Sequence, residues 1–318
     1  MSLREVVHEG ESIESGTIVC NGCAAVYPIV RGLPRFVPAS NYADSFGFQW
    51  NKHARTQLDS HSGFPISRDR IRTAVGPSVG LRGTRILEAG SGAGRFTEVL
   101  VQSGADVVSF DYSSAVDANA TNQGRQASLH LFQGDIFRIP LVEGTFDTVF
   151  CLGVIQHTPD PEAAFRSLVR QVRPGGHLVI DSYARTLAAR LQWKYLLRPI
   201  TRRMRKETLY RLIERVTPPL VPLARALRRL GGRAGARLVP IVEYSHLGLA
   251  PDLNVQWAIL DTFDMYSPAH DHPASEATVR RWYEEAGFVE IDVRPGPNGV
   301  VGRGRRPITP EAAAAAAA

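Results

Sequence analysis

Short apolar runs alternate with amphipathic stretches between Arg85 and Ser182, and this alternation is the main structural signal in the chain. The apolar runs have the length of buried strands: RILEA, DVVSFD, LHLFQGD, FDTVFCLG and GGHLVIDS. The stretches that separate them read as helices: RFTEVLVQSG, SAVDANATNQGRQA and PEAAFRSLVRQV. Strands that alternate with helices predict right-handed crossovers and a mostly parallel sheet covered on both faces, which is a Rossmann-like α/β core.

The same alternation returns near the C-terminus after a long interruption. SEATVRRWYEEAG predicts a helix with Ser275 as its N-cap and Gly287 as its end, and FVEIDVRP and GVVGRGRRP predict two further strands. The interrupting segment is therefore expected to be an insertion at the carboxyl edge of the sheet, where doubly wound folds bind ligands. A helical insertion there would act as a lid.

These patterns divide the chain into five parts. They are an N-terminal hairpin segment at 1–40, the first part of the core at 41–184, the helical insertion at 185–261, the completion of the core at 262–310 and an alanine-rich tail at 311–318. The whole chain of 318 residues is 44% hydrophobic, enough for a buried core. With three cysteines and no leader-like or membrane-spanning apolar stretch, it is expected to be cytoplasmic.

Charge is strongly segregated along the chain. Between Ala184 and Pro240 there are fifteen Lys or Arg and two Glu, a surplus of thirteen positive charges, whereas the whole chain carries a net charge of +6. The rest of the chain is therefore acidic. One very basic segment on an acidic body points to an anionic surface or an anionic small molecule rather than to general coating of nucleic acid.

The stretch ILEAGSGAGRF places Gly90, Gly92 and Gly94 between a predicted strand and a predicted helix. A glycine-rich turn of this kind lets a ligand approach the backbone beside the free N–H groups of a helix N-terminus. The turn lacks the G-x-G-x-x-G spacing of dinucleotide sites, and Glu88 favours a cationic ligand over a phosphate. The next two strands end at Asp111, a possible partner for ribose hydroxyls, and at Asp135, a possible partner for an adenine amino group.

In their order and spacing these motifs resemble the class I S-adenosylmethionine-dependent methyltransferases. The resemblance implies a seven-stranded, mostly parallel sheet with its last strand antiparallel, and S-adenosylmethionine as cofactor with S-adenosylhomocysteine as product. It implies that the glycine turn passes the methionyl part and that the stretch after Phe150 lies beside the sulfonium. The cofactor-binding residues expected on this basis are Glu88, Gly90, Gly92, Gly94, Asp111, Tyr112, Asp135, Ile136, Cys151, Tyr42 and Trp50.

The flanking segments are similar to bacterial methyltransferases of surface-polysaccharide and secondary-metabolite biosynthesis. This narrower resemblance implies O-methylation of a small-molecule acceptor, with anionic and glycosylated molecules among the candidates. Two alternatives stay open: a nucleic-acid methyltransferase, which the stretch CLGVIQHT after the fourth strand disfavours, and a non-catalytic, membrane-associated adaptor that keeps the cofactor fold.

Three histidines are candidates for a general base. His157 follows the fourth strand at the expected methyl position, but such a histidine can equally shape its loop. His270 and His272 flank Asp271 in AHDHP, where the carboxylate could orient a base, the segment could be a capping turn, or the three residues could hold a metal. Nothing else in the sequence completes a metal site, so no metal is expected.

The flanking segments leave further alternatives. Tyr42 and Trp50 could cover the cofactor or simply pack the N-terminal segment on the core. Cys20 and Cys23 resemble half of a zinc ribbon attached to some methyltransferases, but the other Cys pair is absent and a metal-free hairpin is expected. The amphipathic helices predicted in 185–240 could contact an anionic membrane, cover an anionic acceptor, form a homodimer contact or present a solvated basic face.

Overall fold

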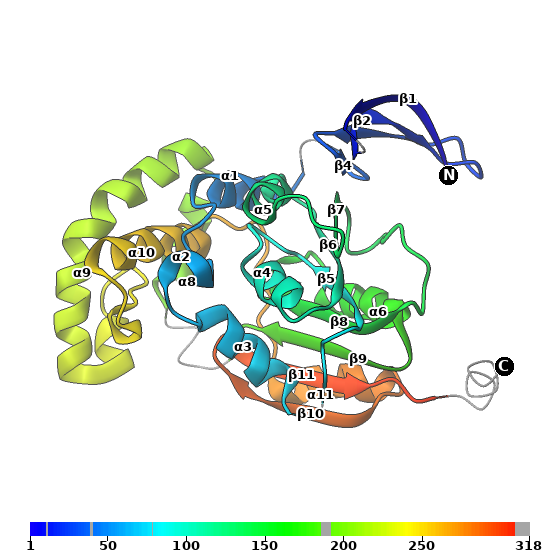
Figure 1. Cartoon of the computed structure of the whole chain (residues 1–318). Helices are drawn as coiled ribbons and strands as arrows, with labels where there is room; N and C mark the ends of the chain where they lie inside the picture. Colours follow the sequence, from blue (N-terminus) through cyan, green and yellow to red (C-terminus); the bar gives the residue numbers. More distant parts are fainter. Residues whose placement is uncertain (11, 39–40, 78, 186–191, 309–318) are drawn as a thin grey trace.

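The computed structural model of the chain describes residues 1–10, 12–38, 41–77, 79–185 and 192–308. The predicted tail at 311–318 lies outside the described residues. Figure 1 shows a central sheet with helices on both faces, a small N-terminal sheet at one side and a group of helices at the other.

The central sheet has seven strands in the order β10-β11-β9-β8-β5-β6-β7. Their bounds are β5 Arg85–Ala89, β6 Asp106–Asp111, β7 Leu129–Gln133, β8 Phe146–Leu152, β9 Val172–Ser182, β10 Val289–Gly296 and β11 Gly299–Arg305. Strands β5 to β9 pair in parallel, and β11 runs antiparallel to both β9 and β10. This topology confirms the predicted Rossmann-like sheet with an antiparallel last strand.

Helices cover both faces of this sheet. They are α3 Ile66–Val75, α4 Arg95–Gln102, α5 Ala115–Gln123, α6 Pro161–Gln171 and α11 Glu276–Glu285. Successive residues of β5 point to opposite faces: Ile86 packs with residues of α3 and α4, and Leu87 packs with residues of α6 and α11. The predicted cap is present, because Ser275 Oγ accepts the Thr278 backbone N–H at 3.1 Å.

The insertion leaves the core after β9 and returns beside it at Ala274, where Ala184 and Ala274 form a parallel bridge. Its helices are α8 Trp193–Thr201, α9 Lys206–Ala236, η2 Ser245–Leu247 and α10 Pro251–Tyr266. α9 is an arc on the outer side of the molecule (Figure 1), and it carries three internal prolines, which disrupt regular helical hydrogen bonds. It packs on α10 through a cluster that includes Leu209, Ile213 and Phe263.

The N-terminal segment forms an antiparallel sheet of β1 Ser2–Glu9, β2 Ser12–Val19, β3 Val26–Val30 and β4 Leu33–Pro34. It contacts the edge of the central sheet at β7, where Arg35 and Gln133 form a parallel bridge and Arg35 pairs with Asp117 at 2.6 Å. The aromatic segment that follows folds into α1 Asp44–Lys52 and α2 Asp59–Ser62. Among the described residues, no helix is both long enough and apolar enough to span a bilayer.

Candidate functional site

The glycine turn between β5 and α4 needs glycine for its backbone shape. Gly90, Gly92 and Gly94 have φ of +83°, +54° and +90°, in the left-handed region that side chains disfavour. A Cβ at Gly90 would collide with Val154, and one at Gly94 with the side-chain amide of Asn119. Backbone conformation and the packing of neighbouring side chains therefore require glycine in this turn. The close approach of a ligand, which the sequence suggested, is a further reason.

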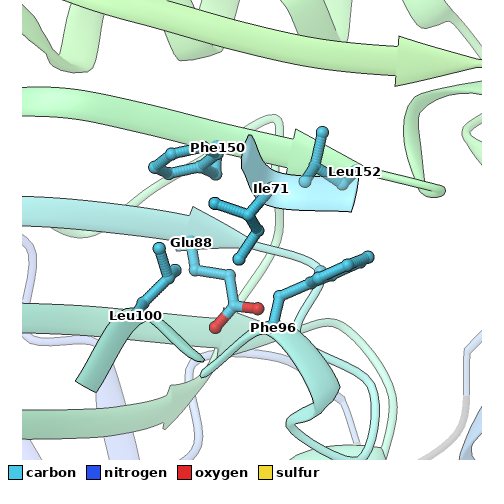
Figure 2. Close-up of a pocket in the computed structure, with 7 residues that line it drawn as sticks. Ile71, Glu88, Phe96, Leu100, Phe150 and Leu152 are labelled. Carbon is cyan, nitrogen blue, oxygen red and sulfur yellow. The ribbon is translucent and has the colours of Figure 1, made fainter. Parts of the chain in front are cut away.

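Glu88 lies under this turn in apolar surroundings. Its Oε2 accepts hydrogen bonds from Thr97 at 2.5 Å and Ser109 at 2.7 Å, and its Oε1 has no partner among the described residues. Figure 2 shows the carboxyl group beside Phe96 and Leu100 of α4, in a crevice too narrow for a water molecule. Burial raises the pKa of Glu88 to about 7, and the two hydroxyl donors only partly offset this.

Replacing Glu88 with Gln should change how stability depends on pH. The folded state holds the Glu88 proton up to pH about 7, whereas the ordinary pKa is 4.5. The native state therefore binds more protons in this window, and its free energy of unfolding falls as pH rises from 4.5 to 7. The loss reaches roughly 3 kcal/mol at 1.36 kcal/mol per pKa unit.

Urea unfolding at several pH values measures this difference between wild type and Glu88→Gln. The exposed Glu143→Gln variant is the control, and its curve should follow that of wild type. Parallel stability curves for wild type and Glu88→Gln between pH 4.5 and 7 would rule out a raised pKa at Glu88.

Four predicted cofactor residues meet at the carboxyl ends of β6 and β7. Asp111 accepts the Gly92 N–H at 2.8 Å and the Ser113 N–H at 2.8 Å, and it keeps part of its surface exposed. The Tyr42 and Tyr112 rings lie 4.7 Å apart. Burial raises the pKa of Tyr42, and the neighbouring carboxylates of Asp135 and Asp111 add to this effect. Two carboxylates and two aromatic rings thus border one region of the sheet edge.

The other predicted cofactor residues lie in different surroundings. The Trp50 ring on α1 lies against Gly92, where it would be 3.3 Å from an added Cβ. Cys151 and Ile136 are 0% and 5% exposed and belong to the hydrophobic core. Burial also raises the pKa of the Cys151 thiol. The structure therefore brings Trp50 to the turn and places Cys151 in the core of the sheet.

His157 lies in η1 Ile155–His157, directly after β8, and is 7% exposed. Its Nδ1 is 3.1 Å from the His270 carbonyl oxygen, so Nδ1 carries the proton and Nε2 is left as the acceptor. The rings of Phe46 and Tyr183 lie 5.0 and 5.3 Å away. Burial lowers the pKa of His157, so its imidazole is neutral at neutral pH.

The AHDHP loop crosses η1, but its charged groups are arranged differently from the prediction. The Asp271 carboxylate is buried and pairs with Lys194 at 2.8 Å and Arg198 at 2.7 Å, both from α8. His270 packs edge-on against Tyr42, with ring centroids 5.4 Å apart, and His272 is exposed. Asp271 thus joins the insertion to the core, and among the described residues its carboxylate forms no hydrogen bond or ion pair with an imidazole.

Sequence reasoning missed a group of acids and phenols where the insertion covers the sheet edge. Tyr183, directly after β9, donates its hydroxyl to Asp264 at 2.9 Å, and Tyr244 donates to Asp261. Burial raises the pKa of Asp261 to about 6, and the charge of Asp264 adds to this. One available signal was the spacing of Asp261 and Asp264, three apart in the largely apolar second half of α10, which places both on one face.

Two arginines extend this group toward α3 and α4. Arg70 pairs with Asp181 at the end of β9, and the Asp181 carboxylate also accepts the Gly153 N–H at 2.5 Å. Arg95, the first residue of α4, donates to Gln57 and Ser67. Burial and the nearby Arg70 charge lower the pKa of Arg95 to about 10. Across the described ranges, no group of three or more His, Cys, Asp or Glu is arranged to hold a metal ion.

Solved structures with similar folds include a methyltransferase in complex with the Haloferax volcanii Trm112 methyltransferase activator, at 12% identity and a TM-score of 0.48. The alignment covers 83% of this chain and 98% of that chain. Magnesium protoporphyrin IX methyltransferase from Synechocystis PCC 6803, with bound SAH, aligns at 16% identity and a TM-score of 0.42, over 83% of this chain and 96% of that chain. At these scores neither likeness supports a functional inference.

Curated relatives include proteins named ubiquinone biosynthesis O-methyltransferase. The one from Xanthomonas oryzae pv. oryzae (strain PXO99A) is 32% identical over 140 residues, which are 42% of this chain and 55% of the relative. The one from Alkalilimnicola ehrlichii is 33% identical over 140 residues, 42% of this chain and 56% of the relative. The chain thus matches little more than half the length of these relatives.

A family profile described as "Methyltransferase domain" matches residues 87–180. This span runs from β5 to β9 and contains the glycine turn, Asp111, Asp135 and His157. The chain therefore contains a methyltransferase domain, in agreement with the resemblance of its motifs to the class I S-adenosylmethionine-dependent methyltransferases.

Proposed function

We propose that the chain transfers a methyl group from S-adenosylmethionine to a hydroxyl group of a small-molecule acceptor. The observation that carries this proposal is the polar wall where the insertion meets the sheet edge, formed by His157, Tyr183, Asp264, Tyr244 and Asp261. It is bounded on one side by the cofactor residues of β6 and β7. The similarity to ubiquinone biosynthesis O-methyltransferases supports oxygen as the methylated atom.

The residues at the sheet edge have the chemistry that the cofactor requires. Asp111 offers carboxylate oxygens to ribose hydroxyls, and the Tyr42 and Tyr112 rings offer apolar faces to an adenine beside Asp135. Gln49 on α1 is 1% exposed, and neither polar atom of its amide has a partner among the described residues. Because an unpaired buried amide is costly, a ligand atom is expected to satisfy it. When bound, the cofactor supplies the methyl group on a positively charged sulfur.

Alignment of the acceptor hydroxyl with the methyl carbon should supply most of the rate enhancement. The acceptor must also lose a proton. His157 is suited to accept it, since its imidazole is neutral, its Nδ1 is held by the His270 carbonyl, and no other described group takes its Nε2. The Tyr183–Asp264 pair is suited to orient the same hydroxyl by hydrogen bonding.

The flanking segments also suggest a class of acceptor, because they are similar to methyltransferases of surface-polysaccharide and secondary-metabolite biosynthesis. We infer a sugar or a natural-product intermediate, because a wall of acids, phenols and arginines offers many hydrogen bonds to a polyhydroxylated molecule. Arg95 donates to Gln57 and Ser67 and forms no ion pair within the described ranges, so its charge favours an anionic group on the acceptor. The membrane and dimer contacts suggested for residues 185–240 are separate from this proposal.

Transfer of a labelled methyl group to sugars, nucleotide sugars and lipid-linked glycans tests the proposed activity. With an acceptor in hand, His157→Ala should lower kcat by about 100-fold, the lower end of the range for a general base. The wild-type rate should hold through neutral pH and fall only below the ordinary titration range of histidine, because burial lowers the pKa of His157.

His272→Ala is the matched control, since that side chain is exposed, and it should retain the wild-type rate. If His157→Ala also retains the rate, another group accepts the proton. If no hydroxyl compound accepts the label while an amine does, the assignment to oxygen fails.

A further inference from the structure

The outer face of α9 carries a line of apolar side chains that nothing in the described structure covers. Leu212, Val216, Leu223 and Leu230 are 48%, 39%, 50% and 87% exposed. Pro219 and Ala226 are also exposed and occupy the intermediate positions of the same line. The steps between these six residues alternate between three and four, which keeps them on one side of the helix. We call these six residues the exposed stripe.

The exposed stripe is distinct from the face by which α9 packs on the rest of the protein. That packing uses Leu209, Ile213, Val221 and Ala224, which are between 0% and 7% exposed. Single exposed leucines are ordinary on protein surfaces, but a continuous apolar line along a helix marks an interaction surface. The apolar surface of α9 thus extends further around the helix than its packing within the protein requires.

A row of arginines follows one flank of the exposed stripe. Arg211, Arg215, Arg225 and Arg229 are all exposed, and each immediately precedes a residue of the stripe. One step along a helix is about 100° around it, so all four arginines lie on the same flank. Within the described ranges, none of the four forms an ion pair, whereas Arg228 on another side pairs with Glu243. We call these four residues the arginine row.

We propose that α9 binds an anionic lipid surface. The helix would lie parallel to the membrane, with the exposed stripe in the boundary between headgroups and acyl chains and the arginine row on lipid phosphates. A second copy of the chain would bring an equal surplus of positive charge to the contact. A nucleic acid would bind the arginine row but leave the exposed stripe in water. Anionic lipid satisfies both features, and the inference does not depend on which acceptor is methylated.

Co-sedimentation of the full chain with vesicles tests this proposal. Vesicles of phosphatidylcholine with about 30 mol% phosphatidylglycerol should bind the protein, and pure phosphatidylcholine vesicles should bind it at least tenfold more weakly. Binding should also weaken as salt is raised, because salt screens the arginine row. Equal binding to both kinds of vesicle would overturn the proposal.

Two sets of substitutions separate the contributions of charge and apolar surface. Arg215→Gln, Arg225→Gln and Arg229→Gln together should weaken binding to the anionic vesicles by about 100-fold, as each surface arginine contributes about fivefold. The matched control places the same three changes at Arg72, Arg82 and Arg138, exposed residues outside the insertion. This control should bind within about threefold of wild type.

Replacing Leu212, Leu223 and Leu230 with Gln tests the exposed stripe itself. These side chains are already exposed, so the fold should be retained, and vesicle binding should fall by about 100-fold. Unchanged binding would mean that charge alone attracts the protein and would overturn insertion of the stripe. Sedimentation velocity without vesicles should show a monomer, and a dimer that the leucine variant dissociates would assign the stripe to a second copy instead.

Discussion

Replacing Asp111 with Ala is expected to weaken the binding of S-adenosylhomocysteine to the full chain by about 1000-fold. The carboxylate lies at the carboxyl end of β6 and can accept both hydroxyls of a ribose. Each hydrogen bond to a charged acceptor contributes about 1.5 to 3 kcal/mol, so the loss of two gives about 3 to 6 kcal/mol. The variant also removes the acceptor of the Gly92 N–H, which helps to hold the glycine turn.

Titration calorimetry measures this effect, and two further variants make it specific. Asp106→Ala changes an acid at the opposite end of the same strand and should leave the affinity unchanged. Asp111→Asn keeps one oxygen for the Gly92 N–H but loses the charge, and its affinity should be intermediate. An Asp111→Ala protein that binds the ligand as wild type does would place the cofactor elsewhere in the chain.

The core of the fold was predictable because its signals are local. The parallel strands of the central sheet contain short apolar runs next to turns, and the strand before α4 was predicted at the residues where β5 occurs. The final helix begins after Ser275 and is followed by Gly287, whose φ of +72° needs glycine. Such patterns depend on residues a few positions apart, so tertiary contacts do not alter them.

The proximity of Asp111 and Asp135 was predictable for a topological reason, whereas their role in binding a cofactor stays a prediction. Parallel strands end at the same edge of a sheet, so residues that follow successive strands meet there whatever lies between them. Asp111 and Asp135 meet in this way, and both charges act on Tyr42, which comes from the N-terminal flank. The placement of Cys151 was not predictable from its position after Phe150 alone, because the face to which a strand residue points depends on the register of the sheet.

The wall that we assign to the acceptor depends on contacts between distant parts of the chain. Tyr183 and Asp264 are 81 positions apart, and Trp257 donates to the Thr56 carbonyl at 2.7 Å across 201 positions. The pattern of apolar and polar residues does not reveal such pairs, because each partner fits the local pattern of its own segment. The pair Asp261 and Asp264 could have been noticed as acids on one face of the largely apolar second half of α10, but their phenol partners could not.

The surroundings of Asp271 also depend on contacts between distant parts of the chain. Its two neighbouring histidines suggested a carboxylate that orients a base. In the structure, Lys194 and Arg198 of α8 form ion pairs with that carboxylate, so it does not orient a histidine. These cations belong to the segment where positive charge is densest, and the sequence could not show that two of its members are buried.

Replacing Asp271 with Ala should lower the free energy of unfolding by about 3 to 5 kcal/mol, the cost of removing one partner from a buried ion pair. The side chains of Lys194 and Arg198 are only 8% and 11% exposed, so neither cation can turn freely to water when its partner is lost. Urea unfolding measures the change. The control is Asp252→Ala, an exposed acid in the first turn of α10, with an expected loss of about 1 kcal/mol or less.

Charge balance, rather than shape, should account for most of this loss. In wild type the three groups sum to one positive charge, and Asp271→Asn raises the sum to two while nearly preserving the side-chain volume. Adding Lys194→Met to Asp271→Asn returns the sum to one, so the double variant should recover at least half of the lost stability. If the double variant is no more stable than Asp271→Asn alone, then the pairing with Arg198 carries the whole effect and Lys194 contributes nothing to holding α8 on the core.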